Sequence, residues 1–161
     1  QPSEIVDRVA ILQEELKATG KALAAAQAEL AVAKAAALAA KAEAVGDFQL
    51  LVERLDGVDG AGLQGAAQSL ADQLGDGAAV VIGGLPDPAD LGKVILVAAF
   101  GKQVIAAKLQ AGKFIGGIAK LCGGGGGGRP NLAQAGGRDG SKLPEALDAA
   151  ADQLKQGLSD V

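Results

Sequence analysis

Six consecutive glycines, Gly123 to Gly128, are followed directly by Arg129 and Pro130, and this run is the part of the chain best suited to binding chemistry. Each glycine loses more backbone freedom on folding than any other residue, so an ordered polyglycine segment needs compensation. Peptide N–H groups in a glycine-rich turn can hold an anion such as a phosphate. The planar guanidinium of Arg129 suits a phosphate or a base edge. The run therefore predicts a loop that binds a polyanion.

The charge pattern around the run supports this prediction. Residues 46–92 contain eight acidic residues and one basic residue, whereas residues 93–142 contain eight basic residues and one acidic residue. A basic segment in a chain whose net charge is −4 offers one place for a polyanion. The candidate binding residues are the glycines and the cations nearest to them: Lys113, Lys120, Gly123, Gly124, Gly125, Gly126, Gly127, Gly128, Arg129 and Arg138.

A purely structural explanation of the same residues stays open at this point. The glycines could pack a strand edge against a helix, and Arg129 could pair with an internal carboxylate. Gln134 could belong to a buried strand, with equal weight for a structural and a functional role. Cys122 fits a small buried hydrophobe, because nothing near it in the sequence favours reactivity.

The absent residue types limit the other chemistry. The chain has no histidine, tryptophan or tyrosine and one cysteine, so we expect no metal site and no catalytic residues. The glycine run lacks the Lys-Ser/Thr that follows a phosphate-binding P-loop. The three phenylalanines, Phe48, Phe100 and Phe114, lie in apolar runs typical of a core, which disfavours base stacking on aromatic rings and leaves recognition through the backbone of a nucleic acid.

The single cysteine and the charge spacing also predict the compartment. One cysteine forms no internal disulfide, which favours a reducing cytoplasm. No stretch of about twenty apolar residues is free of charge, so we expect neither a transmembrane helix nor a membrane partner. The chain begins with Gln1 rather than methionine, which we interpret as a sign of a fragment.

Residues 1–45 are predicted to form one long helical arm, because they are rich in alanine, leucine, glutamate, lysine and glutamine. A heptad is visible in Val9, Leu16, Leu23 and Leu30. The arm could be a linker helix packed against its own domain or against a neighbouring part of a longer protein. It could equally form a coiled-coil seam with a second copy.

Residues 46–161 are predicted to form a compact α/β domain, with a mixed sheet flanked by helices. Strands are expected at 48–55, 78–82, 94–99 and 131–135, where the apolar content is high. Helices are expected at 63–74, at 103–121 with a break near Ala111-Gly112, and at 143–158 with Pro144 in the first turn. The glycine run is expected to be a loop between the helix at 103–121 and the strand at 131–135.

The segment GGGGRPNLAQAGG, residues 125–137, resembles the signature of the C-terminal domain of alanyl-tRNA synthetases, a DHH-associated domain. The Arg-Pro pair and the Ala-Gln-Ala-Gly stretch carry the resemblance, which extends through Ala111-Gly112-Lys113 and the alanine-rich helix. It implies a non-catalytic module that contacts the elbow of alanine tRNA, helps the parent enzyme to dimerise, and couples aminoacylation with editing. ATP, magnesium and an editing-domain zinc would belong to the parent ligase, and no cofactor to this chain.

Two other functions remain open. A DHH-type phosphoesterase can carry a related domain as its nucleic-acid-binding lobe, although its Asp-His-His motif is absent from this chain. Alternatively the long helix is the functional part, as a structural dimerisation element.

Overall fold

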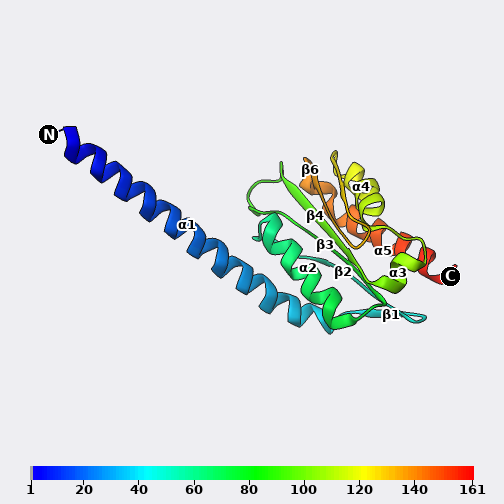
Figure 1. Ribbon diagram of the computed structural model, residues 1–161. Helices are drawn as coiled ribbons and strands as arrows, with labels where there is room; N and C mark the ends of the chain where they lie inside the picture. The colour runs from blue at the N-terminus through cyan, green and yellow to red at the C-terminus, as the bar shows by residue number, and fades with distance from the viewer. Residues whose placement is uncertain (1) are drawn as a thin grey trace.

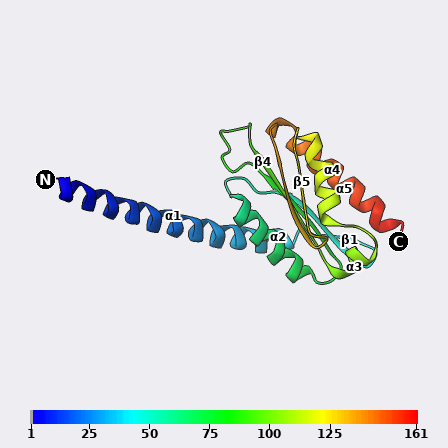
Figure 2. The same ribbon diagram turned by 45° about the horizontal axis from the view of Figure 1, so that its top comes forward.

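The computed structural model describes residues 2–161, and in it one long helix projects from a compact body built on a six-stranded sheet (Figure 1). The strand order is β1-β2-β3-β4-β6-β5, in which β2 and β3 are parallel and every other neighbouring pair is antiparallel. Helices cover both faces of this sheet (Figure 2). The predicted fold class, a long helix followed by a mixed sheet flanked by helices, is therefore confirmed.

The projecting helix α1 (Pro2–Ala39) touches the body only near its C-terminal end (Figure 1). Ala31 and Ala35 are fully buried there against α2 (Gly60–Leu74), because alanine lets the two helix backbones approach closely. Nothing in the described chain covers the large apolar side chains of α1 up to Val32. All nine of them are exposed: Ile5, Val6, Val9, Ile11, Leu12, Leu16, Leu23, Leu30 and Val32.

In residues 2–161, α1 is the one helix whose length and composition would allow it to cross a membrane. The sequence-based expectation of no such segment is not met by this criterion, because only Glu29 and Lys34 are charged between Lys21 and Lys41. The most apolar window has a mean hydropathy of 1.4 and is 11% buried. A single helix of this kind near the N-terminus is weak evidence for a membrane.

The arm ends earlier than predicted, because a β-hairpin begins within the segment assigned to the helix. Strands β1 (Glu43–Val45) and β2 (Phe48–Arg54) pair antiparallel, with Val45 opposite Phe48. The two-residue turn between them needs a positive φ, which Gly46 supplies at 61°. The Gly-Asp pair flanked by apolar residues was the sequence signal for this hairpin.

The central strands β3 (Ala78–Gly84) and β4 (Val94–Phe100) are buried along their whole length, as their continuous apolar runs predicted. On one face α1 and α2 cover Val80, Ile82 and Val97. On the other face α4 (Ala111–Leu121) and α5 (Leu143–Ser159) cover Val81, Leu96 and Phe100. The sheet therefore lies between two separate aliphatic layers, and no charged side chain is buried in the described residues.

The remaining helices follow the predicted pattern closely. The short helix α3 (Lys102–Ala106) is separated from α4 by a break at which Lys108 has a positive φ of 67°. A 3-10 turn, η1 (Gly140–Lys142), leads into α5, which carries Pro144 at its start as expected. Phe100 and Phe114 pack against each other with ring centroids 5.7 Å apart, so the aromatic residues serve the core rather than a stacking platform.

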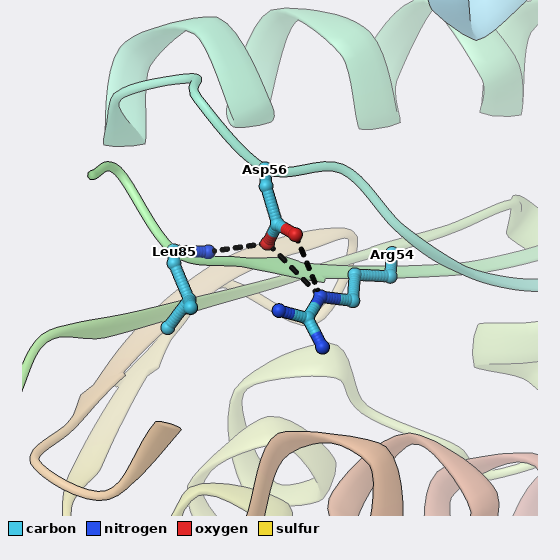
Figure 3. A network of polar contacts seen from close by, with 3 residues as sticks. All are labelled: Arg54, Asp56 and Leu85. Carbon is cyan, nitrogen blue, oxygen red and sulfur yellow. Dashed lines mark hydrogen bonds and ion pairs between the residues drawn. The ribbon is translucent and has the colours of Figure 1, made fainter. Parts of the chain in front are cut away.

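Asp56 hydrogen-bonds the start of the β2–α2 connection to the residue that follows β3 (Figure 3). Its Oδ1 accepts a hydrogen bond of 2.9 Å from the Leu85 N–H, and its carboxylate also binds Nε of Arg54 at 2.8 Å. Next in the chain, the Asp59 carboxylate accepts from the Gly62 N–H and caps α2. These contacts fix where α2 begins over the sheet, and hence its position beside β6.

Candidate nucleic-acid interface

Four of the six glycines in the run form a strand and not a loop, which corrects the prediction from sequence. Strand β5 (Gly125–Gly128) forms one edge of the sheet and pairs antiparallel with β6 (Leu132–Gly137). The Arg129 N–H donates to the Leu132 carbonyl at 3.0 Å and closes the tight turn between the two strands. All four residues of β5 are exposed. The predicted binding segment therefore lies at the surface, although in a different conformation.

Most of the glycine amides are already used within the chain. The Gly123 and Gly124 N–H groups donate to carbonyls of α4, those of Lys120 and Ala119, each at 3.0 Å. Because Arg129 bonds to Leu132, the antiparallel register places Gly125 and Gly127 in the hydrogen-bonded pairs of the ladder. The peptide groups of Gly126 and Gly128 point outward. At most two of the six glycine amides therefore remain for the anion contact that was predicted for the run.

Packing explains why three residues of the run must be glycine. A Cβ at Gly128 would lie 2.7 Å from the Ala133 Cα, one at Gly126 would lie 2.6 Å from the Ala135 Cβ, and one at Gly124 would collide with the Gly136 carbonyl. The edge strand approaches β6 too closely for side chains at these positions. The structural explanation of the glycines is therefore correct for Gly124, Gly126 and Gly128.

Gly125 and Gly127 lack such a reason. A Cβ at Gly125 would meet nothing within 4 Å, and one at Gly127 would meet only the Gly112 carbonyl, at an ordinary 3.9 Å. Neither residue has the positive φ that favours glycine. The register pairs Gly127 with Gln134, so these two glycines face the side of the sheet that carries α2. Within residues 2–161 nothing requires glycine at either position.

The four predicted cations lie in two pairs at opposite ends of the β5–β6 ribbon. Arg129 precedes β6 and Arg138 follows it, so the ribbon separates them by about 20 Å at about 3.4 Å per residue. Lys113 follows Gly112, which contacts Gly128 beside Arg129. Lys120 lies in the last turn of α4, where the Arg138 N–H donates to the Cys122 carbonyl at 2.8 Å. The structure thus brings the cations to the two ends of one ribbon.

These cations are available to an external anion. Lys113, Lys120, Arg129 and Arg138 are all exposed. The ion pairs found in the described part of the chain join other residues: Lys41–Glu53, Arg54–Asp56, Lys142–Glu145 and Lys155–Glu43. The alternative in which Arg129 pairs with an internal carboxylate is therefore wrong.

Four polar residues beside the ribbon were not among the candidates from sequence: Gln64, Gln68, Lys93 and Asn131. Gln64 of α2 donates its Nε2 to Oε1 of Gln134 at 2.8 Å, across 70 positions of the chain. Two surface hollows meet at Gln134, one of about 570 Å³ with Lys93 and Arg138 and one of about 400 Å³ with Gln68 and Arg129. Gln64 and Gln68 of α2 are four residues apart, and that spacing was the available signal for a shared face.

Cys122 is fully buried, as predicted for a small hydrophobe. Burial, and then the nearby carboxylates of Asp139 and Glu145, raise the pKa of its thiol. A raised pKa keeps the thiol protonated and a poor nucleophile. In residues 2–161 no group of three or more histidine, cysteine, aspartate or glutamate side chains could hold a metal ion.

Residues 47–156 match the family model of the DHHA1 domain. The chain is 89% identical over 158 residues to an alanine–tRNA ligase of Parasynechococcus marenigrum strain WH8102, and 92% identical over 154 residues to one of Synechococcus sp. strain CC9605. These alignments cover 98% and 96% of the chain but 18% and 17% of the two relatives. The crystal structure of the C-Ala domain from Aquifex aeolicus alanyl-tRNA synthetase is also similar, at 34% identity and a TM-score of 0.59, over 73% of this chain and 97% of that one.

Proposed function

Since this chain belongs to the DHHA1 domain family, as one of the C-Ala domains of alanyl-tRNA synthetases, we propose that it binds tRNA for a parent alanine–tRNA ligase. The parent would attach alanine to tRNA with ATP and magnesium, and would carry any editing-domain zinc. This module would do no chemistry of its own. The relatives named above are alanine–tRNA ligases, which favours this function over the phosphoesterase lobe.

The observation that supports tRNA binding most strongly is the pair of free cation clusters on the β5–β6 ribbon. Lys113 with Arg129, and Lys120 with Arg138, are exposed and have no carboxylate partner in the described chain. Arginine and lysine at two ends of a ribbon suit two phosphate groups on one folded RNA. We propose that this face contacts the elbow of alanine tRNA in the cytoplasm, and that holding the elbow couples aminoacylation with editing.

Measurement of tRNA affinity over a range of salt concentrations tests the proposal. Arg129→Ala combined with Lys120→Ala removes one cation from each end of the ribbon. Each lost phosphate contact should reduce the slope of log affinity against log salt by about one. Lys17→Ala with Lys21→Ala, on the part of α1 that lies away from the body, is the charge-matched control and should leave the slope unchanged. An unaltered affinity and slope in the ribbon variant would remove the ribbon from the interface.

A second proposed activity is dimerisation through α1, and the exposed heptad favours it. Val9, Leu16, Leu23 and Leu30 repeat every seven residues, and their exposed fractions lie between 47% and 76%. An apolar seam of this period is self-complementary, so a second copy of the same helix can cover it. The parent ligase would then present two copies of the module.

A further inference from the structure

The two hollows on the α2 side of the ribbon share Gln134, whose hydrogen bond to Gln64 spans from the ribbon to α2. We call these two hollows together the glutamine trough. Its carboxamides belong to Gln64, Gln68, Asn131 and Gln134, and its floor is formed by Gly125 and Gly127. Arg129 lies at one end, and Lys93 and Arg138 lie at the other. One wall is the face of α2 that carries residues 60, 64 and 68, and the other is the β5–β6 ribbon. The trough thus runs along the ribbon between the two cation clusters.

Its charge suits a strand of phosphates. Lys93, Arg129 and Arg138 line the trough, and no carboxylate from residues 2–161 does. A third hollow continues past Gln68 and Asn131, but there Asp72 and Asp76 join the lining. The acidic residues therefore end the stretch that a polyanion can occupy.

Its polar groups suit nucleobases. A carboxamide offers both donors and an acceptor, as the edge of a base does. Gln64 and Gln134 are half-buried and fixed by their mutual hydrogen bond, in which the Oε1 of Gln64 takes no part. The Nε2 of Gln134 lies against Gly60 of α2. Gln68 and Asn131 have no side-chain hydrogen bond among the described residues. The four carboxamides lie between the phosphate-binding ends.

The floor explains the two glycines that the fold does not require. A Cβ at Gly125 or Gly127 would occupy space on the α2 side and would make no contact closer than 3.9 Å. Glycine at such a position allows a ligand to approach the peptide backbone closely. A base inserted into the trough would use the room that missing side chains leave.

We propose that the glutamine trough binds a short unpaired RNA segment, with its phosphates at Arg129 and at Lys93 and Arg138 and its base edges on the carboxamides. This inference rests on the proposed function and names the part of the RNA that the module recognises. A paired strand fits the trough poorly, because the Watson–Crick edges of its bases are bonded to the partner strand and the major groove of an A-form duplex is too deep and narrow for side chains.

Two double variants test the trough. Gly125→Val with Gly127→Val places side chains on the floor at positions where a Cβ meets no closer atom than the Gly112 carbonyl at 3.9 Å, and valine suits an edge strand. Gln64→Leu with Gln134→Leu removes both partners of one hydrogen bond together, which costs little stability. Gly117→Ala, on the exposed side of α4 with open space around it, is the control. Urea denaturation establishes that each variant is folded.

The probes are a fluorescein-labelled RNA oligonucleotide without self-complementarity, a blunt duplex of the same sequence, and alanine tRNA. We expect the unmodified chain to prefer the unpaired oligonucleotide to the duplex. Each trough variant should lose roughly fivefold or more in affinity for the unpaired RNA. The neutral glutamine variant should keep its salt slope, since it loses no phosphate contact.

Equal affinity for unpaired and paired RNA, or unchanged affinity in both folded trough variants, would overturn the inference. If tRNA binding still fell in the Arg129→Ala, Lys120→Ala variant, the proposed function would survive without the trough. If the unmodified chain bound neither tRNA nor the oligonucleotide, both the proposed function and the proposed role of the trough would be contradicted.

Discussion

Gly112 of α4 lies directly against the backbone of Gly128, so that a Cβ on Gly112 would be 2.6 Å from the Gly128 carbonyl oxygen. One turn later Gly116 stands in the same relation to the Gly126 carbonyl, at 2.9 Å. These two carbonyls point away from β6, toward the free edge of the sheet. Helix α4 therefore covers the edge of β5, which protects an otherwise open strand from pairing with another chain.

Gly112→Ala should destabilise the protein, because the new methyl group meets a backbone oxygen that cannot rotate away. We expect a loss of about 1–3 kcal/mol in the free energy of unfolding, as for other overpacked contacts. Gly117→Ala in the same helix meets nothing within 4 Å and should raise that free energy by up to about 1 kcal/mol. Urea denaturation of both variants measures the contrast. Equal effects of the two changes would mean that α4 does not seal the edge.

Cys122 should lower the free energy of unfolding of the protein at high pH. Its native pKa is raised above the ordinary 9.0, so between the ordinary and the raised value the unfolded chain loses a proton that the folded chain keeps. The contribution is fully present below about 9 and declines as pH rises through the native pKa. The informative quantity is the difference in this decline between the unmodified chain and Cys122→Ala. The free energy of unfolding of the variant should decline less as pH rises. An equal decline in both proteins would contradict the raised pKa of Cys122.

The exposed heptad of α1 should bring two copies together. Leu16→Glu combined with Leu23→Glu places like charges in the seam and should shift a dimer to monomers in sedimentation equilibrium. Gln13→Glu adds a charge at an exposed polar position of the same helix and is the control. A chain that is monomeric before any substitution would exclude dimerisation through this helix alone.

Much of the fold could be predicted from sequence because its signals are local. The buried strands β3 and β4 are continuous apolar runs, and Pro144 marks the start of α5. The hairpin at Gly46 was missed because alanine-rich helix propensity continues up to it. The conformation of β5 could not be predicted, since glycine has no strand preference and only the β6 backbone and α4 hold it extended.

The candidate interface, too, could be predicted from sequence only in part. Lys113, Lys120, Arg129 and Arg138 could be found by counting charges near a distinctive run. The glutamine trough could not, because Gln64 and Gln134 meet only through the packing of α2 on β6. The charge of each residue can be read from the sequence, whereas a hollow forms only when elements that are distant in the sequence pack together.

A chemical footprint of the chain on alanine tRNA tests the tRNA-binding account most directly. We predict protection of backbone positions at the elbow, where the two loops of the tRNA meet, and loss of that protection in the Arg129→Ala, Lys120→Ala variant. Protection confined to the acceptor or anticodon ends, or an elbow footprint that the variant leaves intact, would contradict the account.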